Sequence, residues 1–350
     1  MTDAKTIYDS VHRRNLLVAG GTLLAAATLP RAIARAADEA LGSAAELLAR
    51  VQKFLAGLDP DMRKAASFAW NGPEWRGWNY FGASGYTKPG LRLEQMSAAQ
   101  KAAAWDLLAA VWSPAGIDKA KNVMLLQDVL ASMGNAPDRR SSGKFSFAVF
   151  GAPAAQGVWG FRLEGHHLTQ SVAVRDGRIV SVTPSSFSSN PNRVPAGAHR
   201  GLVTLKSEEA LARRLYSDLA PALAAKARVS EQPIYNILSA AGRERANAQK
   251  VGVPAASLPS AQRDLLWQLV EAYSVEHLPT ALSAAQRARV RAGDREAVHF
   301  AWHGPNTAEK GFGYRVIGDN FVIEMASVDA EAQHLHTIYN DLGNVLGTAG

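Results

Sequence analysis

The spacing of hydrophobic and polar positions changes from a helical to a strand-like period near the middle of the chain. Before residue 140, apolar residues recur every three or four positions, which predicts amphipathic helices at 38–58, 97–112 and 117–133. Ser97 is a favourable N-cap for the second of these helices. Gly134 follows the third, and glycine commonly ends a helix at this position.

Between Phe145 and Phe187 the pattern alternates with a period of two, which predicts antiparallel strands. Asp176 and Gly177 separate two alternating runs and predict a tight hairpin turn. Helical spacing returns at 207–228, 259–275 and 280–291. The last part of the chain again predicts strands, at 298–302, 312–317, 321–326 and 334–339.

Two parts of the chain resemble each other. Residues 147–153 and 160–168 match residues 300–305 and 313–321 in their order of strand, loop, strand, tight polar turn and strand. A duplicated β unit explains this similarity, and chance likeness among strand ends rich in glycine and proline is the alternative. We therefore expect one α+β domain over residues 37–350, with an antiparallel β core, possibly duplicated, flanked by amphipathic helices.

The N-terminal segment has the three parts of an export signal. Arg13 and Arg14 precede an apolar run of about fifteen residues, and Ala34 and Ala36 form a small-x-small cleavage site. This pattern predicts a twin-arginine signal peptide at 1–36. The protein would then be periplasmic or secreted, and the twin-arginine translocase would be its partner during export. That route carries folded proteins, which favours a metal or cofactor bound before export.

Composition narrows the classes of function. Residues 1–36 hold five of the 38 basic and two of the 31 acidic residues, so the remainder carries a formal charge of +4. Its basic residues are scattered, so we expect no nucleic-acid partner. No further apolar run reaches the ~20 residues of a spanning helix, so we expect no stable membrane anchor. The chain has no cysteine, and any metal must be bound by His, Asp or Glu.

The histidines are unevenly distributed. His166 and His167 are adjacent in an expected turn, and His334 and His336 alternate on an expected strand. Alternate strand residues share a face, which places the latter pair of imidazoles roughly 6–7 Å apart. These four residues are candidate ligands of a divalent metal, with zinc favoured and copper or iron as alternatives. Each motif alone also fits a half-exposed strand or a polar loop.

Two carboxylates are candidates for the same site. If strands 321–326 and 334–339 form a hairpin centred on Ala330, Glu324 lies opposite His336 and could be a ligand or a general base. A slip of one residue would move it to the other face. Glu164 shares a strand face with His166 and is the second candidate catalytic base.

Aromatic residues gather in a glycine-rich stretch that includes Trp70, Trp75 and Tyr80. They could line a pocket for an organic or peptide-like substrate, or they could pack against the sheet. The sequence contains no phosphate-binding loop, no dinucleotide-binding fingerprint and no Gly-x-Ser-x-Gly nucleophile motif.

The motif Arg162-Leu-Glu-Gly-His-His-Leu resembles a family of exported bacterial proteins, the domain of unknown function 3500. The segments 300–305, 314–324 and 334–341 carry the same resemblance, which covers most of residues 60–347. It implies that the four histidines and Glu324 belong to a recurring motif set, together with Asp341 as a further metal candidate. Trp70, Trp302, Arg162 and Arg315 are expected substrate contacts.

Three functions fit these observations. The first is an exported metal-dependent hydrolase acting on a small-molecule or peptide-like substrate. The second uses the same site for copper- or iron-dependent redox chemistry. The third is a periplasmic protein that binds a metal or ligand without turnover.

Overall fold

The computed structural model describes residues 40–82 and 88–348, and the expected signal peptide lies outside these residues. The described helices are α3 (Ala45–Ala56), α4 (Pro60–Ala66), α5 (Pro73–Arg76), α6 (Ala98–Leu108), α7 (Pro114–Ser132), α8 (Lys206–Ser217), α9 (Pro221–Ala227), α10 (Ser260–Ser274) and α11 (Thr280–Val290). None of them is both long enough and apolar enough to cross a membrane.

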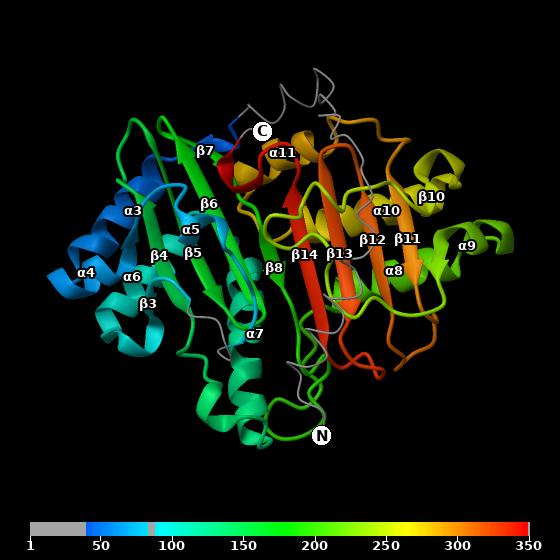
Figure 1. Ribbon diagram of the computed structural model, residues 1–350, viewed down its shortest axis with the longest axis horizontal. Helices are drawn as coiled ribbons and strands as arrows, with labels where there is room; N and C mark the ends of the chain where they lie inside the picture. Colours follow the sequence, from blue (N-terminus) through cyan, green and yellow to red (C-terminus); the bar gives the residue numbers. More distant parts are fainter. Residues whose placement is uncertain (1–39, 83–87, 349–350) are drawn as a thin grey trace, which may run out of the picture.

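The strands are β1 (Gly42–Ser43), β2 (Ser67–Phe68), β3 (Leu91–Arg92), β4 (Ser146–Gly151), β5 (Val158–Gly165), β6 (Leu168–Arg175), β7 (Arg178–Ser181), β8 (Ser185–Phe187), β9 (Arg228–Ser230), β10 (Val253–Pro254), β11 (His299–His303), β12 (Gly313–Ile317), β13 (Phe321–Ser327) and β14 (Leu335–Asp341). They join into one sheet with the central order β10-β11-β12-β13-β14-β8-β6-β5-β4-β2, drawn across Figure 1. The predicted α+β class with an antiparallel core is confirmed.

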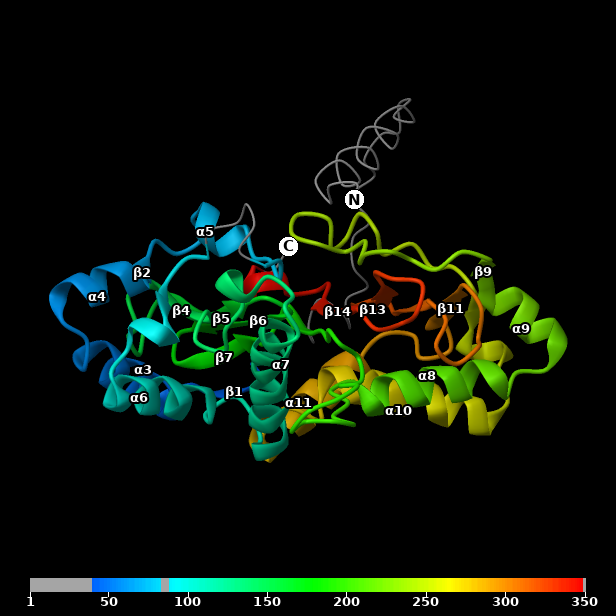
Figure 2. The same ribbon diagram turned by 90° about the horizontal axis from the view of Figure 1, so that it is seen from below.

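The two faces of the sheet are covered differently. Helices α3, α6, α8, α10 and α11 cover one side, which we name the helix face, while α5 and long loops cover the other, the loop face (Figure 2). Alternation along β14 divides its side chains between the two. Leu335 and Tyr339 belong to the large core on the helix face. Ile338 belongs to a second apolar cluster on the loop face, with Trp75 and Tyr80.

The duplication extends beyond the strands that the sequence indicated. In the first half, β2 pairs in parallel with β4, and β3 pairs antiparallel with β4. In the second half, β9 and β10 pair with β11 in the same two ways. The antiparallel run β4-β5-β6 corresponds to β11-β12-β13. The two halves meet at the centre of the sheet, where β8 pairs with both β6 and β14.

The helical predictions hold with two changes, the first of which is that α3 begins at Ala45, because residues 42–43 of the helix expected at 38–58 form β1. Ser97 caps α6, because its hydroxyl accepts from the Gln100 backbone N–H at 3.3 Å. The single helix expected at 207–228 is two helices, since α8 ends at Ser217 and α9 begins at Pro221. Proline has no N–H and clashes with the preceding turn of a helix, so it begins a new helix here.

The predicted register of the last hairpin is wrong. Ala326, not Glu324, lies opposite His336, and Glu324 pairs with Ile338. The turn is displaced because the Asp329 carboxylate accepts from the Gln333 backbone N–H at 2.8 Å. A register change that shifts the partner by two residues preserves the face, so Glu324 still lies on the loop face.

Candidate metal centre

His166 and His167 form the two-residue turn between β5 and β6, since Gly165 and Leu168 on either side are paired. His167 has a φ of 69°, in the left-handed region that costs a non-glycine residue about 1 kcal/mol. Its backbone is held on both sides. The His167 N–H donates to the Tyr80 carbonyl at 2.8 Å, and its carbonyl accepts from Ser188 at 2.8 Å. The strained turn therefore presents its imidazole in a fixed direction.

His334, directly before β14, and His336, on β14, bring two further imidazoles to the same place. The Nε2 atom of His334 lies 2.9 Å from Nε2 of His167 and 3.0 Å from Nε2 of His336. The short β8 lies between β6 and β14 and so brings together residues 167 positions apart in the sequence. The Nε2 atom of His334 thus takes part in both short contacts.

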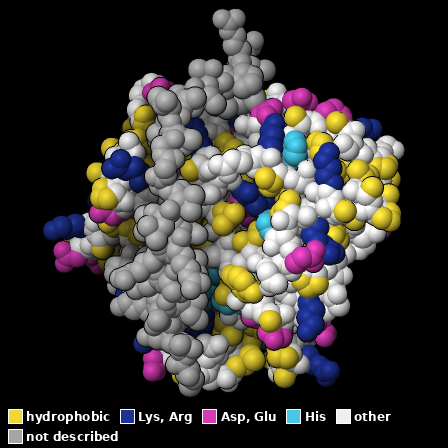
Figure 3. Space-filling view, turned by 45° about the vertical axis from the view of Figure 1, so that its right-hand side comes forward, with side chains coloured by type: hydrophobic (Ala, Val, Ile, Leu, Met, Phe, Trp, Pro, Cys, Tyr) yellow, Lys and Arg dark blue, Asp and Glu magenta, His cyan; other side chains and the backbone are white. Residues whose placement is uncertain are grey.

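Three of these residues form a group that could hold a metal ion. His166, His167 and His334 each offer a ligand atom within 4.8 Å of the others. His167 is buried, while His166 and His334 are partly exposed. In the space-filling view, histidine side chains are visible at the surface among basic and hydrophobic side chains (Figure 3). The partial exposure of His166 and His334 leaves the group accessible to solvent on their side.

Hydrogen bonds outside the cluster orient His336. Its Nδ1 lies 3.0 Å from Oδ1 of Asn236, and the same oxygen accepts from the Tyr80 hydroxyl at 2.7 Å. An oxygen acceptor at Nδ1 favours the tautomer with the proton on that nitrogen. The Nε2 lone pair of His336 then points into the cluster. The Tyr80 ring also meets the His336 ring edge-on, with centroids 4.8 Å apart.

His166 has a different environment. Its Nδ1 lies 2.7 Å from a terminal nitrogen of Arg140 and 2.6 Å from Oε1 of Gln127. A guanidinium only donates and a carboxamide oxygen only accepts, so these two neighbours favour opposite tautomers of His166. The His166 ring packs against His167, with ring centroids 3.8 Å apart. Nδ1 of His166 is therefore engaged by Arg140 and Gln127, and His166 lies at the edge of the cluster.

Burial keeps these imidazoles neutral. It lowers the pKa of His334 to about 4, with a smaller contribution from Arg140. Burial also lowers the pKa of His166, His167 and His336 well below 6.5, and the neighbouring imidazoles contribute in each case. Neutral imidazole is the form that binds metal ions, so no proton has to leave before coordination at neutral pH.

The comparison with known families adds one relationship. The sequence matches the family described as protein of unknown function (DUF3500) over residues 41–345, which is most of the chain. The chain belongs to that family. The resemblance noted from the sequence is thereby confirmed. No curated protein and no solved structure matches the chain significantly.

Glu324 of this DUF3500 protein is a structural anchor. Its carboxylate accepts from Nε of Arg315 at 2.7 Å and from the backbone N–H groups of Leu238 and Ser239 at 2.7 and 3.0 Å. It does not belong to the group of side chains that could share an ion. Arg315 also donates to the Asn247 carbonyl. Glu324 was expected as a catalytic base and Arg315 as a substrate contact. Together they hold the loop that carries Asn236.

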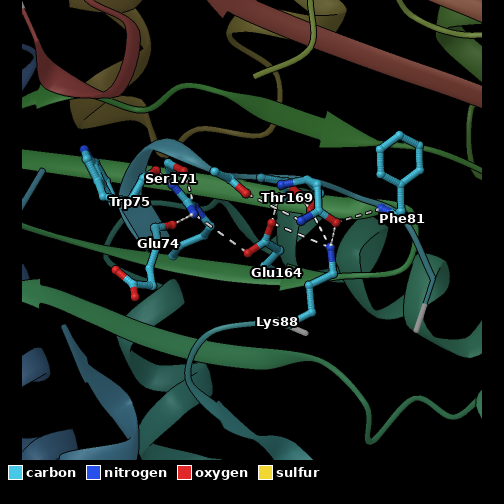
Figure 4. Close-up of polar contacts among 10 residues, drawn as sticks. Glu74, Trp75, Phe81, Lys88, Glu164, Thr169 and Ser171 are labelled. Atoms are coloured by element: carbon cyan, nitrogen blue, oxygen red, sulfur yellow. Dashed lines mark hydrogen bonds and ion pairs between the residues drawn. The ribbon is translucent and has the colours of Figure 1, made fainter. Parts of the chain in front are cut away.

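Glu164 has the corresponding place in the first half. It accepts from the backbone N–H of Asn79, and its carboxylate lies 3.6 Å from Nζ of Lys88 and 3.8 Å from Arg162. Figure 4 shows Lys88 and Glu164 pointing toward one another in this network. Arg162 is fully buried and donates to the carbonyls of Glu74 and Trp75. These residues fix the loop that carries Tyr80.

The remaining expected site residues lie away from the histidines. Asp341 is on the helix face, where its carboxylate lies 3.2 Å from Nη1 of Arg289. Trp302 is fully buried in the same core and stacks on Tyr216 with centroids 4.7 Å apart. Trp70 packs on Trp75 at 4.8 Å. In the described residues, these three side chains have packing and ion-pair contacts with other parts of the fold.

Proposed function

We propose that this protein is an exported metal-dependent hydrolase that holds one ion between Nε2 of His167, His334 and His336. The two contacts of His334, at 2.9 and 3.0 Å, carry this proposal. A neutral imidazole Nε2 has either one proton or one lone pair, so His334 cannot hydrogen-bond well to both neighbours. Ligands of a tetrahedral zinc site lie roughly 3.3 Å apart, close to the two separations that join His334 to His167 and to His336.

Asn236 supports the same assignment. A metal-bound histidine almost always donates its other ring nitrogen to an oxygen acceptor, and His336 has this arrangement. His166 is the exception, because Arg140 occupies its Nδ1. We assign His166 to the edge of the site, where its ring can contact a bound substrate.

The chemistry of the donor set favours hydrolysis. A divalent ion held by three neutral imidazoles supplies Lewis acidity and lowers the pKa of a bound water to about 7. The protein residues provide a closed side, made by Tyr80 and Asn236, and an open side next to His166. Zinc is the proposed ion, and copper or iron with redox activity is the second possible result of a metal analysis.

The direct test is elemental analysis of the purified protein, followed by assays with chromogenic carboxylic and phosphoric esters. We expect about one zinc per chain and ester hydrolysis that stops with chelator and returns with zinc. Stoichiometric copper or iron without hydrolysis would support the redox alternative. Zinc without hydrolysis of any ester would support binding without turnover. A folded protein that takes up no metal would contradict the metal site.

Export through the twin-arginine route is part of the proposal. The paired Arg13 and Arg14 before a short apolar run support it. Replacing both by lysine is expected to leave an uncleaved precursor in the cytoplasm, whereas the wild-type protein should begin at Ala37. Cell fractionation and N-terminal sequencing measure this, with Lys5→Gln as the control. Equal export of the double variant would contradict this route.

A further inference from the structure

The histidine cluster lies next to the positive charge of Arg140, which no carboxylate balances in the described residues. This guanidinium acts on His166, His167 and His334. The nearest buried carboxylates on the loop face are already paired, Glu164 with Lys88 and Arg162, and Glu324 with Arg315. A divalent ion among neutral imidazoles would add two further positive charges. The bound substrate is then the natural source of negative charge.

Lys88 is not available to supply a substrate contact. Its ammonium donates to the Asn79 carbonyl at 2.7 Å and to the Asn79 side chain, and it lies 3.6 Å from Glu164 (Figure 4). These contacts use its donors within the loop that carries Tyr80. Lys88 therefore fixes that loop, and its charge is balanced locally.

Arg140 differs from Lys88, because its hydrogen-bond partners carry no negative charge. Its Nε donates to the Asn135 carbonyl at 3.1 Å, and one terminal nitrogen donates to Gln127 Oε1 at 3.0 Å and His166 Nδ1 at 2.7 Å. Its Nε also lies 3.4 Å from the side-chain oxygen of Asn135, and all of these acceptors are neutral. Across residues 40–82 and 88–348, no carboxylate forms an ion pair with Arg140, and its other terminal nitrogen has no protein acceptor. The guanidinium is half-buried, held in place and directed at the edge of the cluster.

We propose that Arg140 binds an oxyanion of the substrate, a carboxylate or a phosphoryl group. This inference rests on the proposed metal-dependent hydrolysis and names its substrate class. The second terminal nitrogen of Arg140 has two N–H groups without a protein acceptor in the described residues, and a charged guanidinium N–H is a strong donor to an oxygen of such a group. The oxyanion would lie between Arg140 and the histidines, and the bond to be hydrolysed would lie next to the ion.

Anion binding to the cobalt-loaded protein tests this proposal. Inorganic phosphate and acetate are titrated separately, followed by the visible absorption of cobalt and by calorimetry. Arg140→Gln is expected to weaken binding of the preferred anion by about 10- to 100-fold, with cobalt content unchanged. Arg140→Lys should recover only part of the loss, because an ammonium keeps the charge but lacks the extra N–H groups that hold Arg140 against Asn135, Gln127 and His166. Tighter phosphate binding would indicate a phosphoryl substrate, and tighter acetate binding a carboxylate.

The neighbouring Arg139 is the matched control. It is exposed at the end of a short 3-10 helix, Pro137–Arg139, so Arg139→Gln removes the same charge nearby without touching the cluster. It should bind both anions like the wild type. Equal anion affinity of Arg140→Gln and wild type would overturn the proposal. If no cobalt binds, the proposed function fails, and the same titrations of metal-free protein still decide whether anion binding depends on Arg140.

Discussion

Replacing His334 by alanine is expected to lower the affinity of the protein for zinc by more than about 100-fold. Loss of an outer hydrogen-bond partner costs about 10- to 100-fold, and loss of a ligand should exceed it. His334 is the residue whose Nε2 meets both other nitrogens, at 2.9 and 3.0 Å, so no remaining pair is equally close. Competition with a chelator of known affinity measures the effect.

His199→Ala is the control, because His199 is an exposed histidine away from the cluster. It should bind zinc like the wild type. Thermal melts give a second readout. At zinc concentrations 100 times its Kd, the wild type should gain about 2.7 kcal/mol of stability, and His334→Ala should gain almost none. An affinity of His334→Ala within about threefold of the wild type would show that zinc does not bind at these histidines.

Asn236→Ala should give an intermediate result, a 10- to 100-fold loss of zinc affinity, because it frees Nδ1 of His336 without removing a ligand. If the Asn236 side chain had only a structural role, Asn236→Ala would lower the free energy of unfolding by the same amount with and without zinc. A metal site predicts a larger loss of stability with zinc present. The comparison of the two conditions therefore separates the two roles of Asn236.

Local sequence patterns predicted the strands and one side of the cluster. His334 and His336 share a face because side chains of a strand alternate, and His166 and His167 fall in a turn that follows a strand. The same alternation could have excluded Asp341, which is five residues from His336 and so points to the other face. The repeat could also have been followed into the helices, where Gln100 and Trp105 have the same spacing as Gln262 and Trp267.

The rest of the cluster depends on contacts that no local pattern contains. His167 reaches His334 only because β8 pairs with both β6 and β14. Asn236 and Arg140 come from irregular loops, whose positions depend on hydrogen bonds to side chains of other elements rather than on hydrophobic spacing. Glu324 belonged to the expected site because a carboxylate near histidines suggests catalysis. Its partner Arg315, nine residues earlier, was the sequence signal for an ion pair across neighbouring strands.

Replacing Glu324 by alanine is expected to destabilise the protein by about 3–5 kcal/mol, because it leaves the buried charge of Arg315 without a partner. It also removes the acceptor of two backbone N–H groups of the loop that carries Asn236. Urea denaturation of zinc-free protein measures the change. Glu231→Ala is the control in the same loop, since Glu231 forms an exposed pair with Arg228 and should contribute less than about 1 kcal/mol.

The more conservative Glu324→Gln distinguishes an anchor from a metal ligand. Glutamine still accepts from the loop, so this variant should remain folded in dilute buffer while losing part of the stability that the charge provides. Its zinc affinity should stay within about tenfold of the wild type, because Glu324 lies outside the nitrogen cluster. Unchanged stability together with a loss of zinc binding as large as that of His334→Ala would instead make Glu324 a ligand. If Glu324 is an anchor, Glu324→Gln instead loses stability and keeps its zinc affinity. The reason is that the buried carboxylate neutralises Arg315 and therefore attracts an ion only weakly.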